Sequence, residues 1–259
     1  MKIALCFIIN YEHLLNKEDI WREWIEPNQD IINVYFYYKD FGKIKSKWIR
    51  DNAIPREHIY PTSYLHVIPA YMSLMNYAVG ADHENKWFVF LTDSCCPIIP
   101  AAKFRSMFET HCEKSIIRCR RAWWNTRIHL RANLAKLPYE LQLGNDPWFI
   151  LTRNHVIWCI DFVNKYRNMV KLVCDGGFAN ESLFAIILYK QQASIISEPT
   201  HISDWSRMSS RTSPYTFRDV NKNDIQFIDK SLKENEFVMF IRKVAPEYPD
   251  NIIMKYLKY

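Results

Sequence analysis

Glycine is scarce in this chain of 259 residues, which contains only Gly42, Gly80, Gly144, Gly176 and Gly177. None of them forms the GxGxxG or GxxxxGKS/T spacing with which a glycine-rich loop brings backbone amides close to a phosphate. A dinucleotide-binding fold of the glycine-loop type and a P-loop are therefore excluded. Any phosphate that binds to this protein has to be held by side chains.

Compact sets of metal ligands are also missing. The sequence has no Asp-x-Asp, no His-x-x-x-His and no other short-range group of carboxylates and histidines, so we expect no metal and no resident cofactor. The seven cysteines form an odd set without paired short spacings, and Cys95 and Cys96 are adjacent. This pattern is typical of neither a disulfide framework nor a zinc site, so we expect reduced thiols.

Long apolar runs are absent too. The N-terminal segment KIALCFII has an apolar run of only about seven residues, and no stretch reaches the roughly 20 apolar residues that a membrane span needs. No cleavage pattern of small residues follows this run. We therefore expect a soluble, cytoplasmic protein without signal peptide or membrane anchor. The formal net charge of +6 is mixed with many acidic residues, which argues against a polycation that coats nucleic acid and fits a small anionic ligand equally well.

Segments rich in Ile, Val, Phe and Tyr alternate with segments of helical spacing along the whole chain. Strand, helix and strand are predicted for 2–9, 16–25 and 31–38, and the spacing of Leu65, Ile68, Met72, Met75 and Val79 predicts a helix over 63–79 before an apolar strand at 87–91. Further strands and helices are predicted at 115–119, 148–152, 154–166, 180–191 and 237–241. This alternation indicates an α/β sheet with helices on both faces. No Pro/Gly/Ser-rich linker interrupts the chain, so we expect a single domain, residues 1–259.

Two segments are candidates for ligand binding. The turn TDSCCP, residues 92–97, follows the apolar run 87–91, and sheets of this class bind ligands outside the carboxyl ends of their strands. Arg242 and Lys243 follow the apolar run 237–241, and a guanidinium beside an ammonium group could grip a diphosphate in place of a metal. The alternative for this pair is a solvated charge pair without a specific role.

Several segments occur in an order that resembles the core-2/I-branching β-1,6-N-acetylglucosaminyltransferase and peptide O-xylosyltransferase family, including its short microbial and viral-type members. The matching segments are KIALCFIIN with IWREWI, WFVFLTDSCCPIIP, DPWFILTRNHV, NESLFAIIL, ISDWS, SPYTF and FIRKV. The resemblance implies a GT-A type nucleotide-sugar-binding fold, an α/β/α sandwich with a mostly parallel central sheet. It also implies an inverting, metal-independent glycosyltransferase that uses a UDP-sugar.

Carried onto the matching positions, the resemblance implies that Glu181 is the catalytic base and that Arg242 and Lys243 grip the diphosphate. The chain departs from the family at Asn180, where an aspartate is usual, at Ser213 in place of a histidine, and at Val244 in place of a phenylalanine. These departures bear on the donor and the acceptor more than on the reaction class. A structural alternative for Glu181 is that it merely begins a helix that Asn180 caps.

The other site candidates lie on the donor and acceptor sides of the same reaction. Asp93 and Ser94 stand where metal-dependent relatives of the fold carry Asp-x-Asp, and a lone carboxylate there favours hydrogen bonds from ribose or sugar hydroxyls over a cation. The alternative is that both residues only close a turn. Arg211 is a further candidate for contacting the donor. The candidates for contacting the acceptor are Asp146, Trp148, Asp204 and Trp205.

Residues 114–131 are strongly basic and include Trp123 and Trp124. One interpretation is an acceptor-side loop that favours an acidic glycan or peptide. The other is a non-catalytic nucleic-acid-binding segment, because basic residues with interleaved aromatics bind single strands. The rest of the chain has no nucleic-acid-binding motif, so we expect no nucleic-acid partner. We expect a UDP-sugar donor, with N-acetylglucosamine favoured over xylose, and a glycan or glycoprotein acceptor; an inactive sugar-nucleotide-binding relative is a third hypothesis.

Overall fold

A computed structural model describes residues 1–210 and 213–258. Within this part, a six-stranded sheet has the order β2 (Ile32–Tyr37), β1 (Lys2–Ile8), β3 (Asn85–Thr92), β8 (Ile150–Thr152), β5 (Ser115–Ile116) and β9 (Ile195–Ile196). Strand β8 runs antiparallel to both of its neighbours, whereas the remaining neighbours pair in parallel. The predicted α/β fold with a mostly parallel central sheet is confirmed.

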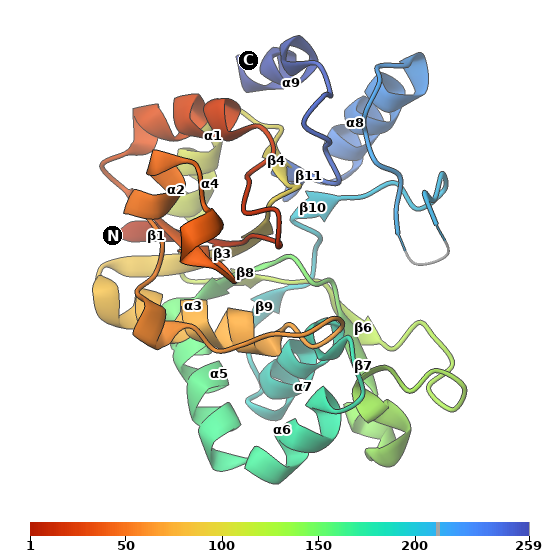
Figure 1. Cartoon of the computed structure of the whole chain (residues 1–259). Coiled ribbons are helices and arrows are strands. Elements are labelled where there is room, and N and C mark those ends of the chain that lie inside the picture. Colours follow the sequence, from red (N-terminus) through yellow and green to blue (C-terminus); the bar gives the residue numbers. More distant parts are fainter. Residues whose placement is uncertain (211–212, 259) are drawn as a thin grey trace.

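Helices cover both faces of this sheet (Figure 1). One face carries α3 (Ile68–Ala81), α5 (Arg153–Lys165), α6 (Arg167–Cys174) and α7 (Leu183–Lys190), and the other carries α1 (Glu18–Ile25), α2 (Lys47–Asp51) and α4 (Ala101–His111). Side chains alternate along a strand. Cys6 and Phe90 therefore enter the core below α3, and Phe7 and Leu91 enter the core below α1.

The predicted helix over 63–79 is wrong at its start. Helix α3 begins at Ile68, and Pro69 occupies its first turn, where the missing amide of a proline costs no hydrogen bond. Leu65 lies outside the helix with a φ of 66°. It turns the chain so that its carbonyl accepts a hydrogen bond from the amide of Phe178 at 2.8 Å.

A small second sheet brings the end of the chain to the turn after β3. It has the order β10 (His201–Ile202), β11 (Phe240–Ile241) and β4 (Cys96–Pro97). Helix α8 (Lys222–Glu234), between β10 and β11 in the chain, and helix α9 (Asp250–Leu257), after β11, flank it (Figure 1). The predicted strand over 237–241 is thus shorter than expected and belongs to this sheet. The amide of Val244 donates to the carbonyl of Ser94 at 2.9 Å. Arg242 and Lys243 are therefore fixed beside the TDSCCP turn.

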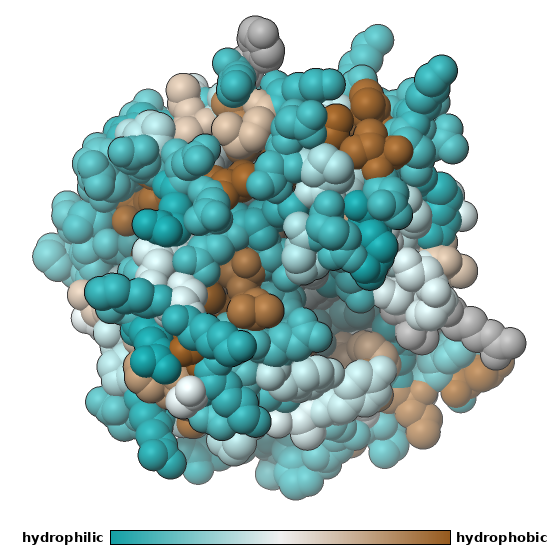
Figure 2. Space-filling view, turned by 45° about the horizontal axis from the view of Figure 1, so that its top comes forward, coloured by the Kyte–Doolittle hydropathy of each residue, from teal (hydrophilic) through white to brown (hydrophobic). Residues whose placement is uncertain are grey.

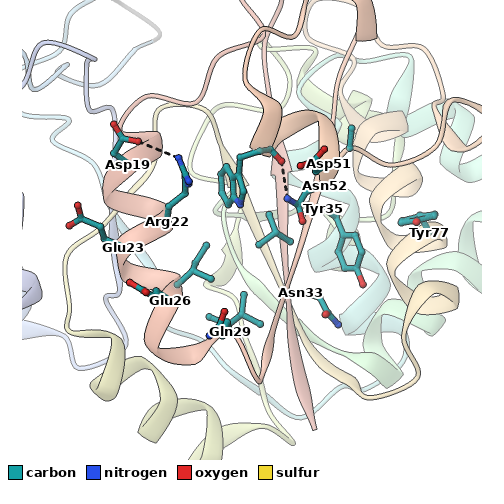
Figure 3. Close-up of a pocket in the computed structure, with 15 residues that line it drawn as sticks. Asp19, Arg22, Glu23, Glu26, Gln29, Asn33, Tyr35, Asp51, Asn52 and Tyr77 are labelled. Carbon is teal, nitrogen blue, oxygen red and sulfur yellow. Dashed lines mark hydrogen bonds and ion pairs between the residues drawn. The ribbon is translucent and has the colours of Figure 1, made fainter.

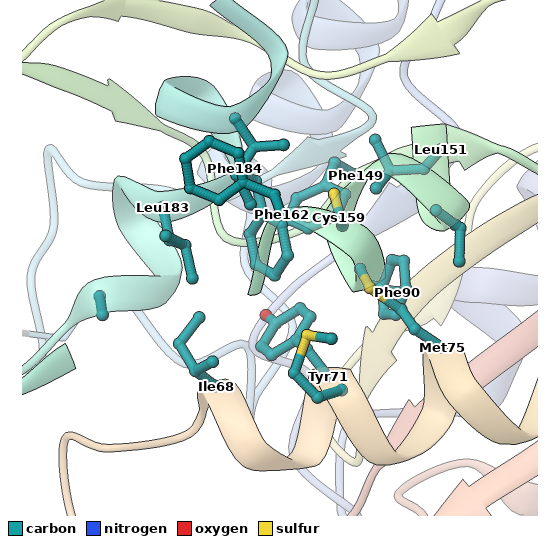
Figure 4. Close-up of a cluster of buried hydrophobic side chains, with 14 of the residues drawn as sticks. Ile68, Tyr71, Met75, Phe90, Phe149, Leu151, Cys159, Phe162, Leu183 and Phe184 are labelled. Carbon is teal, nitrogen blue, oxygen red and sulfur yellow. The ribbon is translucent and has the colours of Figure 1, made fainter. Parts of the chain in front are cut away.

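An aromatic cluster between the sheet and α3 surrounds the ring of Tyr71, whose hydroxyl reaches the chain just before Trp148. The ring of Tyr71 from α3 packs against Phe90, Phe149 and Phe184 at centroid distances of 5.3, 5.8 and 5.2 Å, and Figure 4 shows the same residues around the tyrosine. The Tyr71 hydroxyl donates to the carbonyl of Pro147 at 2.6 Å. Because a buried phenol needs a partner for its hydroxyl, this bond also sets the position of the neighbouring Trp148.

The hairpin of β6 (Cys119–Arg121) and β7 (Leu143–Asn145) carries residues 122–142 beyond the sheet. Two glycines hold this segment close to the body. At Gly144 a Cβ atom would lie 2.7 Å from the ring of Trp123. At Gly176 a Cβ atom would lie 2.2 Å from the amide nitrogen of Asn133, and the Gly176 carbonyl accepts a hydrogen bond from Ala132 at 3.1 Å.

The cysteines were expected to be reduced thiols. All seven cysteines are free, as predicted, and Cys95 is fully buried. Burial raises the pKa of the Cys95 thiol, which is typical of an unreactive structural thiol.

Among residues 1–210 and 213–258, none of the helices has the length and apolar character needed to cross a membrane.

Gly176→Ala tests how tightly the 122–142 segment is held. The added methyl group would collide with backbone atoms, so we expect the free energy of unfolding to fall by roughly 1–3 kcal/mol. Gly80→Ala is the matched control, because Gly80 lies in α3 with nothing within 4 Å of the added Cβ atom; it should raise the free energy of unfolding by about 0.5–1 kcal/mol. Urea denaturation of both variants measures the difference, and equal values would contradict the tight contact.

Candidate functional site

The turn after β3 presents Asp93 and Ser94 at the carboxyl ends of the parallel strands. Both residues are partly buried, and the carbonyl of Asp93 accepts a hydrogen bond from the amide of Asn16 at 2.9 Å. Burial raises the pKa of the Asp93 carboxyl to about 6, although Arg242 and the amides of Ser94 and Asn10 act in the opposite direction. Asp93 thus combines the predicted turn position with an electrostatic interaction with Arg242.

Arg242 is the cation at the centre of the site. Its guanidinium lies over the indole of Trp148, with 4.2 Å between the guanidinium carbon and the ring centroid. Burial lowers its pKa, and the neighbouring Cys95 and Asp93 counter this effect. Its Nε atom is buried and has no hydrogen-bond partner among the described residues. Such a guanidinium retains donors and charge for an anion, because a buried cation is costly unless it is paired.

Lys243 extends the positive charge away from Arg242. The ammonium group donates to the hydroxyl of Ser213 at 2.6 Å. Burial, and next the charge of Arg242, lower the pKa of this lysine, while Asp93 raises it. The two cations are therefore close enough to repel each other, and an anion that lies between them would relieve this repulsion.

Glu181 lies in the short 3-10 helix Ala179–Glu181 that precedes α7. Only 17% of its side chain is exposed, and its carboxylate is 3.0 Å from the guanidinium of Arg131. Burial raises the pKa of Glu181, and the charge of Asp146 raises it further, whereas Arg131 and Arg242 lower it. The alternative that Asn180 caps a helix is wrong, because Ser182 occupies the N-cap position of α7 and makes no side-chain capping bond.

Asp146 follows β7 and lies beside Glu181. Its carboxylate is 2.7 Å from the guanidinium of Arg118, and burial raises its pKa against the opposing effect of Arg118. The preceding residue, Asn145, is fully buried and connects the two acidic residues: its side chain donates to the carbonyl of Asn180 at 2.9 Å and accepts from the amide of Ala185 at 3.1 Å. The side chain of Asn145 thus holds the segments that carry the two carboxylates together.

Seven predicted residues therefore gather in one site: Asp93, Ser94, Asp146, Trp148, Glu181, Arg242 and Lys243. The site lies between β10 and β11 on one side and the β6–β7 hairpin on the other (Figure 1). The space-filling view shows a hollow right of its centre (Figure 2). Carboxylates with raised pKa values and a partly buried cation are typical of a functional site.

Three other predicted residues belong to the loop after β10 or lie outside the described residues. Asp204 is only 2% exposed, and its carboxylate accepts hydrogen bonds from Ser206 and from Arg207, whose guanidinium also contacts Asp224. These contacts give Asp204 a role in organising its own loop. Trp205 is 54% exposed beside it. Arg211 lies outside the described residues.

The residues that the sequence did not single out as site residues are Arg131, Arg118 and Tyr71. Both arginines belong to the basic segment 114–131, but nothing in the spacing identifies their acidic partners. The Tyr71 phenol interacts electrostatically with Arg242 and Glu181, and burial raises its pKa. Helical periodicity assigns Tyr71 to the core, and its hydroxyl becomes visible as a site neighbour only in three dimensions.

A metal cluster, or a large groove away from the predicted residues, would point to a different functional site. Within the described part of the chain, no three or more His, Cys, Asp or Glu residues come together as a metal site. A groove of about 920 Å³ lies at the β2 edge, between α1 and the end of α2, and includes Arg22, Asn33 and Tyr35 (Figure 3). None of the predicted site residues lines this groove.

Arg131→Met tests the electrostatic environment of Glu181. Because the guanidinium stabilises the ionised carboxylate, we expect its removal to raise the pKa of Glu181 further above the ordinary value. Arg131→Lys keeps the positive charge and should retain most of the effect. The measurement is an NMR titration of ¹³C-labelled glutamate carboxyls, with Glu181→Gln to assign the signal. An unchanged pKa in Arg131→Met would contradict the ion pair.

Comparison with known proteins agrees with this arrangement. No curated protein matches the chain. The model of the Core-2/I-Branching enzyme family matches residues 34–229, which include β3, the β6–β7 hairpin and Glu181. This match covers most of the chain, and the family is one of glycosyltransferases that use a nucleotide-sugar donor and a glycan acceptor. The chain belongs to the Core-2/I-Branching enzyme family and is a UDP-sugar-dependent glycosyltransferase.

Proposed function

We propose that the protein transfers a sugar, N-acetylglucosamine in the first instance, from its UDP-sugar to a hydroxyl of a glycan or glycoprotein. The transfer inverts the anomeric centre in a single displacement, needs no metal, and is carried out by one catalytic unit formed by residues 1–259. Glu181 acts as the general base, and Arg242 with Lys243 binds the diphosphate. UDP-xylose is the alternative donor.

In this reaction the oxygen of an acceptor hydroxyl attacks the anomeric carbon while the bond from that carbon to the diphosphate oxygen breaks. The acceptor proton passes to the Glu181 carboxylate, the electron pair of the broken bond stays on the diphosphate oxygen, and Arg242 and Lys243 stabilise the negative charge of the departing UDP. General-base catalysis typically contributes about 10²–10⁴-fold. Cations that are already in position stabilise the leaving group without reorganisation.

The observation that carries the proposal is the placement of Glu181 relative to Arg242. The two residues come from segments 61 positions apart in the sequence, and their charges interact in the folded chain. A base and a leaving-group cation have to face one substrate from different sides. The shared neighbour Tyr71, which interacts with both, supports their convergence on one site.

Two features support diphosphate binding by side chains. Arg242 has a buried Nε atom without a partner among the described residues, and it lies next to Lys243. Asp93 lies beside this pair and is suited to accept a hydrogen bond from a ribose or sugar hydroxyl. The proposal thus assigns the diphosphate to the cations and the hydroxyl groups to Asp93 and Ser94.

Thermal unfolding with UDP, UDP-N-acetylglucosamine, UDP-xylose and UDP-glucose tests the donor site. A ligand at about 100 times its Kd should raise the free energy of unfolding by about 2.7 kcal/mol, and we expect this effect to persist in EDTA. Lys243→Met should weaken UDP binding by about 10- to 100-fold, because a hydrogen bond to a charged group is lost. Lys190→Met, at the exposed end of α7, is the matched control. Binding that requires manganese would overturn the metal-independent mechanism.

Glu181→Gln tests the catalytic base. The amide cannot accept the proton, so we expect kcat to fall by about 10²–10⁴-fold while UDP binding is retained. The measurement combines initial rates of UDP release in the presence of acceptor with calorimetric UDP titrations. An amide variant as active as the wild type would remove Glu181 from the mechanism. A wild type that binds UDP-sugar without turnover on any acceptor would favour the inactive relative.

A further inference from the structure

Six side chains that include Glu181 form a connected group, through direct contacts and through charge. We name it the arginine–aromatic ring, and its members are Glu181, Arg131, Trp124, Trp123, Arg120 and Asp146. Four of the six belong to the segment that the sequence marks as basic and aromatic. The proposed reaction uses only Glu181, so the other members require a separate explanation.

Direct contacts define one half of the ring. The guanidinium of Arg131 is 3.0 Å from the Glu181 carboxylate and 5.0 Å from the ring centroid of Trp124. Trp124 and Trp123 meet edge to face with their centroids 4.8 Å apart. The guanidinium of Arg120 then lies over Trp123 at 4.3 Å. The chain of contacts therefore leads from the proposed base to an exposed arginine.

Electrostatic interactions connect the remaining members of the ring. The arginines here, Arg118, Arg120 and Arg131, outnumber the carboxylates of Asp146 and Glu181 by one. Arg120 lowers the pKa of Asp146, and Asp146 raises that of Glu181. The hairpin pairs Arg120 with Gly144, two residues before Asp146. Arg118 pairs with Asp146 and Arg131 pairs with Glu181. Arg120 is exposed and makes no salt bridge within residues 1–210 and 213–258. It is thus the cation of this site that is available to a ligand.

Trp123 supplies a flat apolar surface beside this cation. Its side chain is among the exposed large hydrophobics, with 45% of the residue exposed, and Gly144 on β7 leaves the space in which the indole lies. Gly144 lies directly opposite Arg120 in the hairpin, so the space above Gly144 and the Arg120 side chain are on the same face of the hairpin. The guanidinium of Arg120 lies over the indole, so a sugar ring that carries an anionic group can contact the exposed part of Trp123 next to this cation.

We propose that the arginine–aromatic ring binds an acidic sugar residue of the acceptor, with the sugar ring on Trp123 and its carboxylate or sulfate on Arg120. The inference rests on the proposed transferase function and adds the class of its acceptor. Arg120 is connected to Glu181 through Trp123, Trp124 and Arg131, so the hydroxyl that accepts the transferred sugar belongs to a residue of the same glycan. Arg120 and Trp123 are substrate-binding residues that determine acceptor specificity.

Tryptophan fluorescence titrations without donor test this proposal. The probes are a hyaluronan tetrasaccharide with carboxylates, a chondroitin sulfate tetrasaccharide with sulfates, and the neutral N-acetylchitotetraose. We expect the wild type to bind one or both acidic probes at least about 10-fold more tightly than the neutral one, as a charge-assisted contact provides. Whichever acidic probe binds more tightly identifies the anionic group.

Two arginine variants separate a specific contact from general electrostatics. Arg120→Gln should lose about 10-fold in affinity for the acidic probe and nothing for the neutral one. Arg127→Gln removes an equal charge from an exposed position in the same segment, outside the ring, and should change affinity less than about threefold. Circular dichroism verifies that both variants are folded, and Trp123→Phe should retain more affinity than Trp123→Ala.

Equal losses in Arg120→Gln and Arg127→Gln, or equal affinity for acidic and neutral probes, would overturn the proposal. A single-stranded dT decamer that binds more tightly than the acidic tetrasaccharides, and with a steep dependence on salt, would overturn it in favour of nucleic acid. UDP titrations on the same samples keep the two proposals apart. A protein that binds acidic probes through Arg120 but does not bind UDP would refute the transferase function and not the acidic-sugar site.

Discussion

The partly buried guanidinium of Arg242 is the constraint on which the site depends. A cation withdrawn from water costs several kcal/mol unless charges and dipoles compensate it. Here the indole face of Trp148 and the carboxylate of Asp93 provide part of that compensation. These partners come from different parts of the central sheet, and Arg242 comes from the small second sheet. The short strands β10, β11 and β4 therefore serve to position Arg242 at the carboxyl end of β3.

Much of the fold could be predicted from the sequence, because periodicity reflects burial. The runs 3–9 and 87–91 are apolar throughout since both faces of their strands are covered, and this pattern is visible without tertiary information. The motif segments also marked Glu181, Asp93 and Arg242, which do come together. The start of α3 was missed because apolar spacing continues through Leu65, although the local backbone there is left-handed.

The partners of the acidic residues could not be predicted, because they depend on how distant segments pack. Glu181 and Arg131 are 50 positions apart, and their approach requires the carbonyl of Gly176 to bind the amide of Ala132. Ala132 and Asn133 both have positive φ values; asparagine is enriched in this region but alanine is not, so the sequence does not predict the turn at Ala132. The basic segment looked like a single charged surface in the sequence. In three dimensions its arginines have different roles, since Arg118 and Arg131 are paired with carboxylates, whereas Arg120 makes no salt bridge with any described residue.

The departure at Asn180 has a physical reason in this arrangement. Asn180 is buried next to Glu181, whose carboxylate and that of Asp146 already repel each other, and its carbonyl accepts a hydrogen bond from the side chain of Asn145. An aspartate at this position would add a third carboxylate to a poorly solvated cluster, and would raise the pKa of Glu181 further. The neutral side chain avoids this charge, and the backbone contact with Asn145 does not depend on it. The ionisation of Glu181 is left to the balance between burial and Asp146 on one side and Arg131 and Arg242 on the other, so a ligand that competes for Arg131 would also change the pKa of Glu181.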